Sequence, residues 1–126
     1  MKALNIIECA YRATIEEQDD TIVWLTHAMK AAGADLGLVL RGDAVNYAVR
    51  AQNAAGLAFG DWRQTQPPRL ADDIALLVTK GVAVYVLAED LVLRGLDAAD
   101  LVPGLERVTR ESLPGIFAAH DQIWHW

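Results

Sequence analysis

Short apolar runs alternate along the chain with segments whose apolar residues recur at helical spacing. Residues 4–7 predict a first strand, and residues 35–40, apolar almost throughout, predict a second one. A strand covered on both faces of a parallel sheet has this continuous apolar pattern. The segment between them has four apolar residues on one helical face, namely Ile22, Leu25, Met29 and Ala32.

Start and stop signals bound this first helix. Asp19 or Asp20 can begin it, because a short carboxylate accepts the free amide hydrogens of the first turn. Lys30 near the end and Gly33 just beyond it are typical of a helix C-terminus. Residues 9–18 before the helix form a fairly polar loop.

The middle of the chain is less regular. Residues 44–52 predict a short helix, and residues 53–68 form one long irregular stretch that includes Phe59 and Trp62. Loops of this length in a compact domain usually act as lids or contact surfaces. A further amphipathic helix, stopped at Lys80-Gly81, is predicted from Leu70, Ile74, Leu77 and Val78.

The last third returns to the same alternation. Residues 82–87 are the clearest strand, which we expect at the centre of the sheet, and residues 89–94 predict a short helix closed by Gly95. Residues 105–109 predict a fourth strand and residues 122–124 a last one. The helix between them is predicted to be capped by Ser112, with Pro114 in its first turn.

Strict alternation of strands and helices predicts the fold class: α/β, a three-layer flavodoxin-like domain with a parallel sheet of about five strands, formed by residues 1–126 as a single domain. Ligands of open parallel sheets bind beyond the carboxyl ends of the strands, where the strand order reverses. We expect that point between the first and third strands. Residues 9–12, 41–43 and 88–90 would then meet.

Composition narrows the function classes. Hydrophobic residues make up 53% of 126, which fits a covered sheet or burial by oligomerisation, and a net charge of −6 disfavours nucleic acid as a partner. A single cysteine allows no intrachain disulfide, and neither a signal peptide nor a membrane span is recognisable, so we expect a cytoplasmic protein. No metal-ligand spacing appears, with His27 expected to be structural and His120 and His125 scattered, and no nucleotide-binding loop or other cofactor motif is present.

Several segments together resemble the DsrE/DsrF-like family of sulfur-relay proteins over nearly the whole chain. They are residues 24–28 (WLTHA), 40–45 (LRGDAV), 81–87 (GVAVYVL) leading into 94–96 (RGL), and 121–124 (DQIW). The resemblance implies a flavodoxin-like fold, a homotrimer or homohexamer, and persulfide transfer through a cysteine. In active members that cysteine directly follows the third strand, and here the matching position is Leu87. Leucine cannot carry a sulfane sulfur, so any activity of this kind, sulfurtransferase-like at most, needs another nucleophile.

Cys9 is the candidate catalytic residue, since it follows the first strand and faces the predicted crevice. A thiolate there could be stabilised by turn amides and by Arg12 or Arg41, and could accept a persulfide sulfur. The alternative is that Cys9 is a small, half-buried apolar residue. Glu8 beside it disfavours the thiolate.

The candidate ligand-binding residues are Arg12, Arg41, Asn46 and Glu89. Arg41 can hold an anion with two parallel hydrogen bonds, or instead form a surface salt bridge with Asp43 or Glu8. Asn46, like Tyr47, could line the same pocket. Glu89 and Asp90 begin a helix, where acids interact favourably with the helix dipole. The alternative is that they supply an acid of the functional site beside Cys9.

Two functional hypotheses follow. The first is a DsrE-like subunit of cytoplasmic sulfur metabolism that binds a sulfur-carrier protein or a sulfur-bearing anion, with Cys9 as persulfide acceptor. The second is a noncatalytic oligomeric scaffold, or a regulatory or small-molecule-binding paralogue, without covalent chemistry. We expect a homo-oligomer in either case, with Trp62 and its neighbours in a subunit contact.

Overall fold

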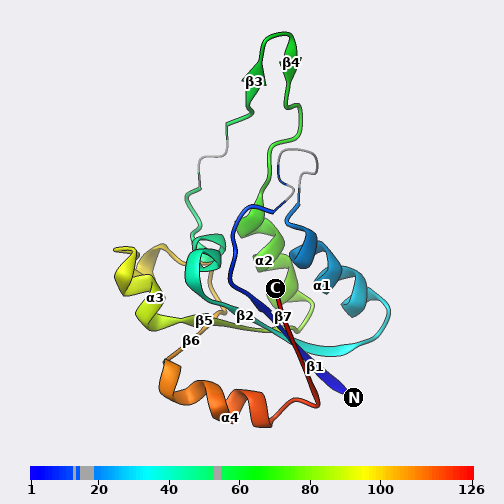
Figure 1. Cartoon of the computed structure of the whole chain (residues 1–126), viewed down its shortest axis with the longest axis vertical. Helices are drawn as coiled ribbons and strands as arrows, with labels where there is room; N and C mark the ends of the chain where they lie inside the picture. Colours follow the sequence, from blue (N-terminus) through cyan, green and yellow to red (C-terminus); the bar gives the residue numbers. More distant parts are fainter. Residues whose placement is uncertain (13, 15–18, 53–54) are drawn as a thin grey trace.

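The computed structural model of the chain describes residues 1–12, 14, 19–52 and 55–126. Parts of the predicted loop 9–18 and of the stretch 53–68 lie outside these residues. One parallel sheet has the strand order β6-β5-β2-β1-β7. In Figure 1 the sheet lies between α4 on one side and α1 and α2 on the other. Its strands, in chain order, are β1 (Lys2–Ile7), β2 (Asp35–Leu40), β5 (Ala83–Leu87), β6 (Glu106–Val108) and β7 (Gln122–His125). The predicted flavodoxin-like α/β class is confirmed.

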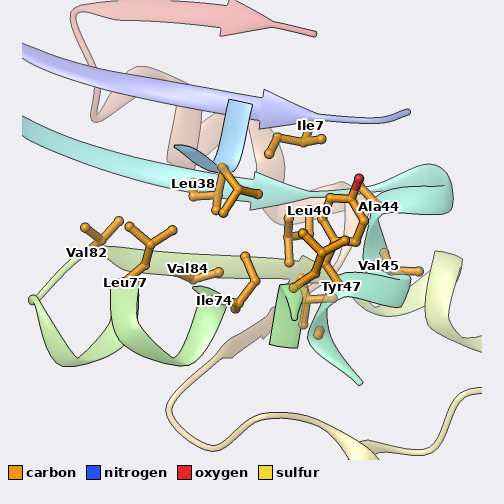
Figure 2. Close-up of a cluster of buried hydrophobic side chains, with 14 of the residues drawn as sticks. Ile7, Leu38, Leu40, Ala44, Val45, Tyr47, Ile74, Leu77, Val82 and Val84 are labelled. Carbon is orange, nitrogen blue, oxygen red and sulfur yellow. The ribbon is translucent and has the colours of Figure 1, made fainter. Parts of the chain in front are cut away.

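The two faces of the sheet are covered by different helices. One face packs against α1 (Thr21–Ala31), α2 (Leu70–Thr79) and the 3₁₀ helix η1 (Gly42–Ala48). Alternate strand residues such as Leu38 and Leu40 meet Ile74 and Leu77 of α2 and the ring of Tyr47 in this core (Figure 2). On the other face, Leu113, Ile116 and Phe117 of α4 (Leu113–Ala118) pack against a smaller cluster containing Leu4, Ile6, Val39 and Leu87. The structure therefore has three layers.

The strand order corrects two predictions. The third strand, β5, pairs with β2 and β6 rather than lying at the centre, which β2 occupies. The chain progresses from β1 outward to β6 and then returns to place β7 on the free side of β1, so the order reverses between β1 and β7, not between the first and third strands. Residues 88–90 consequently adjoin the end of β2, and the end of β7 adjoins residues 8–9.

Three local predictions were also wrong. The helix predicted over 44–52 is η1, which begins at Gly42 and ends at Ala48, because apolar residues at 44, 45 and 48 suit a 3₁₀ turn as well as an α-helix. The stretch 53–68 contains a hairpin of β3 (Ala58–Phe59) and β4 (Trp62–Arg63). The hydroxyl of Ser112 donates to the carbonyl of Thr109 and does not cap α4.

The remaining elements lie close to their predicted ranges. A short α3 (Ala88–Leu93) follows β5 directly, and the 3₁₀ turns η2 (Ala98–Asp100) and η3 (Arg110–Ser112) flank β6. Of the two predicted caps of α1, Asp20 is the one used, and its carboxylate accepts the backbone hydrogens of Ile22 and Val23. Among the residues described, no helix is both long and apolar enough to span a bilayer.

Candidate functional site at the carboxyl edge of the sheet

The three sequence segments predicted to carry the site all follow strands that end at one edge of the sheet. Parallel registers align Ile7 with Leu40 and Leu40 with Val86. The residues after these positions therefore emerge side by side, in the order of the strands. Cys9 lies in this row as a free, exposed thiol two residues beyond β1.

The turn that carries Cys9 is held against the start of η1. The Arg41 amide donates to the carbonyl of Ile7 at 3.0 Å, and the Ala44 amide donates to the carbonyl of Glu8 at 3.3 Å. Gly42 has φ +54°, and a Cβ added there would lie 3.0 Å from Cγ of Glu8. Glycine at this position lets the two chains pass closely, so the segment before Cys9 is fixed on one side by η1.

The end of β7 fixes the same turn from the other side. The amide of Glu8 donates to the carbonyl of Trp126 at 3.1 Å, and the Glu8 carboxylate is 2.7 Å from Nε2 of His125. The sequence did not predict His125 as the partner of Glu8, because only the position of β7 beside β1 brings them together. The Glu8 side chain, next to Cys9 in the sequence, is thereby held by β7.

A buried tyrosine anchors the far end of the turn. Tyr11 has a left-handed backbone with φ 60°, and its amide donates to the hydroxyl of Tyr47. That hydroxyl donates in turn to the carboxylate of Asp20 at 2.7 Å, and the two tyrosine rings pack edge to face. Burial, together with the Asp20 carboxylate, raises the pKa of Tyr47 well above its ordinary value. Tyr47 is thus a structural anchor rather than an open pocket wall.

Arg41, the residue after β2, and Arg12, three residues after Cys9, are both half-buried. Nε of Arg41 is shielded from solvent and has no hydrogen-bond partner among the described residues. The alternative salt bridges considered for Arg41 are not formed in the described part of the chain, since Asp43 pairs with Arg94 at 2.6 Å and Glu8 pairs with His125. Arg41 therefore forms no salt bridge with a described residue.

Asp90 ties α3 to the turn after β2. It is 4% exposed, and its carboxylate accepts the Gly42 amide hydrogen at 2.7 Å and binds Arg110 at 2.9 Å. Burial raises the pKa of Asp90, but the hydrogen bond from Gly42 and the charges of Arg110 and Arg94 outweigh it, so the pKa lies below its ordinary value. Asp90 is therefore ionised near neutral pH and holds the turn that contacts Glu8.

The other two predicted ligand residues have partners of their own. Both carboxylate oxygens of Glu89 accept the backbone hydrogen of Arg110, at 3.0 and 3.2 Å, which directs Glu89 toward the end of β6. The Asn46 amide donates to the carbonyl of Asp43 at 2.8 Å within η1. Because β2 lies between β5 and β1, the residues after β5 lie next to the Arg41–Gly42 turn after β2 rather than next to the turn after β1.

Leu87, which the sequence resemblance matches to the family's cysteine, is the last residue of β5 and is fully buried. Its side chain packs with Leu4, Ile6, Val39 and Leu113 between the sheet and α4. The position is therefore filled by the hydrophobic core. In the described residues, no three His, Cys, Asp or Glu side chains are grouped as metal ligands.

Comparisons with known proteins identify the fold. No model of a known protein family matches the chain, and no curated protein matches it. Among solved structures, the chain is similar to the YchN protein from E. coli, with 19% identity and a TM-score of 0.74 over 100% of both chains. It is also similar to MTH1491, a protein of unknown function from Methanobacterium thermoautotrophicum, with 13% identity and a TM-score of 0.67 over 98% of this chain and 97% of that one. The chain thus shares the flavodoxin-like fold of these two proteins.

Proposed function

We propose that residues 1–126 act as a single DsrE-like domain in cytoplasmic sulfur metabolism, which accepts sulfane sulfur on Cys9 from a sulfur-carrier protein or a sulfur-bearing anion. The observation that carries this proposal is the exposed position of the chain's one thiol at the carboxyl edge of the sheet. The position used by the family is occupied by buried Leu87, so Cys9 is the only cysteine that can serve.

The transfer step needs no external oxidant. The Cys9 thiolate attacks the outer sulfur of a donor persulfide, the sulfur–sulfur bond of the donor breaks, and the donor leaves as a thiolate. The new bond makes Cys9 a persulfide. The departing thiolate takes up the proton that the Cys9 thiol released before the attack. Exposure of Cys9 allows a protein donor to approach in line with that bond.

Basic side chains at the same edge support recognition of the donor. Arg41 has no ion-pair partner among the described residues, and Arg12 lies three residues beyond Cys9. A guanidinium binds thiosulfonate or carboxylate groups through paired hydrogen bonds. We assign Arg41 and Arg12 to binding an anionic group of the donor.

Intact-mass measurement tests this proposal. The protein is incubated with a persulfidated small thiol or with polysulfide, and the expected adduct is about 32 or 64 Da, one or two sulfur atoms. Cys9→Ser is expected to remain unmodified. Arg41→Gln is expected to gain sulfur more slowly when the donor is the anion thiosulfate than when it is a neutral persulfide. The absence of any adduct on the unaltered chain would refute sulfur transfer.

A noncatalytic scaffold or regulatory subunit is the second candidate, and Leu87 favours it, because the family's nucleophile has been replaced by a core residue. In that case the fold and its surfaces carry the function. The same mass measurement separates the two candidates, since a scaffold takes up no sulfur.

Homo-oligomerisation is part of either proposal, and the β3–β4 hairpin supports it. The hairpin projects away from the sheet and helices (Figure 1), and Phe59 and Trp62 at its tip are 61% and 44% exposed, with ring centroids 5.7 Å apart. An isolated two-stranded hairpin is marginally stable in water. We assign the tip to a contact with another subunit, and light scattering of Trp62→Ala is expected to show a smaller assembly than the unaltered chain.

A further inference from the structure

Strand β7 has one open edge that no described part of the chain covers. Trp126 donates its amide hydrogen to Ile6 and accepts from Glu8, so its backbone points toward β1. Because backbone groups alternate along a strand, Trp124 also points toward β1, and Ile123 and His125 point their N–H and C=O groups away from the sheet. No described residue hydrogen-bonds to these outward groups.

The two edges of the sheet differ in how they are protected. On β6, the outer strand at the other edge, two of three residues, Glu106 and Arg107, are charged and exposed. Charged side chains discourage pairing with another strand. Strand β7 has no lysine, arginine, carboxylate or proline, and Ile123 is 42% exposed. The β7 edge thus lacks the charged residues and prolines that discourage pairing of a free edge.

We propose that β7 pairs antiparallel with β7 of a second copy about a twofold axis at Trp124. This register sets Ile123 of each copy opposite His125 of the other, so both outward residues of each strand exchange N–H···O=C bonds with the partner copy. An axis at Ile123 or at His125 would form only one such pair within β7. The strand edge is therefore most complementary to itself when Trp124 faces its own copy.

The side chains beside the edge fit the same register. Trp124 and Trp126 border an open hollow of about 430 Å³, together with Leu25 of α1 and His125. Opposite residues of a non-hydrogen-bonded pair have Cα atoms about 4.5 Å apart, so the two Trp124 rings would meet at the axis and cover both hollows. A second copy thus supplies both the backbone groups and the apolar surface that this edge lacks.

Cysteine crosslinking tests the register. In a Cys9→Ser background, Trp124→Cys places two thiols opposite each other, within disulfide geometry, and diamide is expected to link the copies. Gln122→Cys is the matched control, because it lies on the same face of β7 but about 13 Å from its own copy in this register. We expect crosslinking at least about tenfold faster at position 124. Equal rates at the two positions would overturn the proposal.

A proline variant tests the contact without any crosslink. Ile123→Pro removes an outward N–H and leaves the β1–β7 ladder intact, because that ladder uses residues 122, 124 and 126. Sedimentation velocity is expected to show an assembly of half the size, with an unchanged circular dichroism spectrum. Ile123→Val, which keeps the N–H, is expected to retain the parent assembly. A monomeric parent chain, or an assembly that Ile123→Pro leaves whole, would contradict the proposal.

Discussion

The hydroxyl of Tyr47 donates a hydrogen bond to the carboxylate of Asp20 at 2.7 Å and so links η1 to the N-terminus of α1. Both residues are fully buried. Asp20 caps α1 through its other oxygen, and the Tyr47 hydroxyl accepts the Tyr11 amide hydrogen. One hydroxyl therefore joins a helix cap to the turn that follows Cys9.

Removing this hydroxyl should cost stability. Tyr47→Phe keeps the ring but leaves a buried oxygen of Asp20 and the Tyr11 amide without their partner, and we expect a loss of about 1–3 kcal/mol in the free energy of unfolding. Urea denaturation followed by circular dichroism measures it. Tyr85→Phe is the control, since no described residue hydrogen-bonds to the Tyr85 hydroxyl, and equal losses for the two variants would show that the Asp20 contact is not responsible.

Asp73 in the first turn of α2 should make stability depend on pH. Burial, followed by the nearby charges of Asp19 and Asp72, raises the pKa of Asp73 from 3.8 to about 7. The folded chain then holds a proton that the unfolded chain has lost, so the free energy of unfolding should fall as pH rises from about 4 to about 7. Nε2 of His27 contacts the Asp73 carbonyl, and Lys80 contacts Nδ1 of the same ring.

Asp73→Asn should remove this dependence, because asparagine resembles the protonated acid and does not titrate. Denaturation curves between pH 4.5 and 8 are expected to show a flatter profile than the parent and greater stability at pH 8. Asp35→Asn, at an exposed strand end, is the matched control and should keep the parental slope. A slope that persists in Asp73→Asn would assign the pH dependence to other groups.

Two carboxylates near the site should contribute differently to the free energy of unfolding. Asp90 is buried and hydrogen-bonds to the Gly42 amide, whereas Asp43 forms its ion pair with Arg94 while 70% exposed. Asp90→Asn is expected to cost about 1.5–3 kcal/mol because a charged hydrogen bond is weakened in the interior. Asp43→Asn is expected to cost less than about 1 kcal/mol. Thermal or urea unfolding of the pair decides this, and the reverse order would contradict the placement of Asp90.

Gly42 should tolerate no side chain. Gly42→Ala forces a left-handed residue, at about 1–2 kcal/mol, and brings a Cβ to 3.0 Å from Glu8, so both stability and the position of the Cys9 turn should suffer. Gly115→Ala in α4 meets open space and should stabilise by up to about 1 kcal/mol. Unfolding curves and the alkylation rate of Cys9 by iodoacetamide measure both effects, and an alkylation rate unaffected by Gly42→Ala would detach Gly42 from the thiol's turn.

Local signals predicted most of the elements, but not their order in space. The predicted strand 35–40 has the same bounds as β2, because a continuous apolar run lies between Asp35 and the Arg41-Gly42 turn. The hairpin at Phe59 and Trp62 was missed because two-residue strands leave no alternating pattern. The contact between Glu8 and His125 joins residues 117 positions apart, and only the placement of β7 beside β1 creates it.

For the candidate site, the sequence predicted which strand ends lie at one edge but not which side chains contact one another there. The segments after β1, β2 and β5 do gather at one edge, as parallel strands require, which places Cys9 and Arg41 in one row. The partners of Glu89 and Asp90 depend on Arg110, whose position after β6 is set by the tertiary fold. No spacing in the sequence reveals such a contact.

Peptide mapping after exposure to a persulfidated donor protein, with its outer sulfur isotopically labelled, tests the central claim most directly. Trypsin releases residues 3–12 as one peptide containing Cys9. The account predicts that this peptide carries the labelled sulfur, with a gain of about 32 Da before isotope correction, and loses it to an added acceptor thiol. Label that remains on the donor, while Cys9 stays an unmodified thiol, would contradict sulfur transfer by this chain.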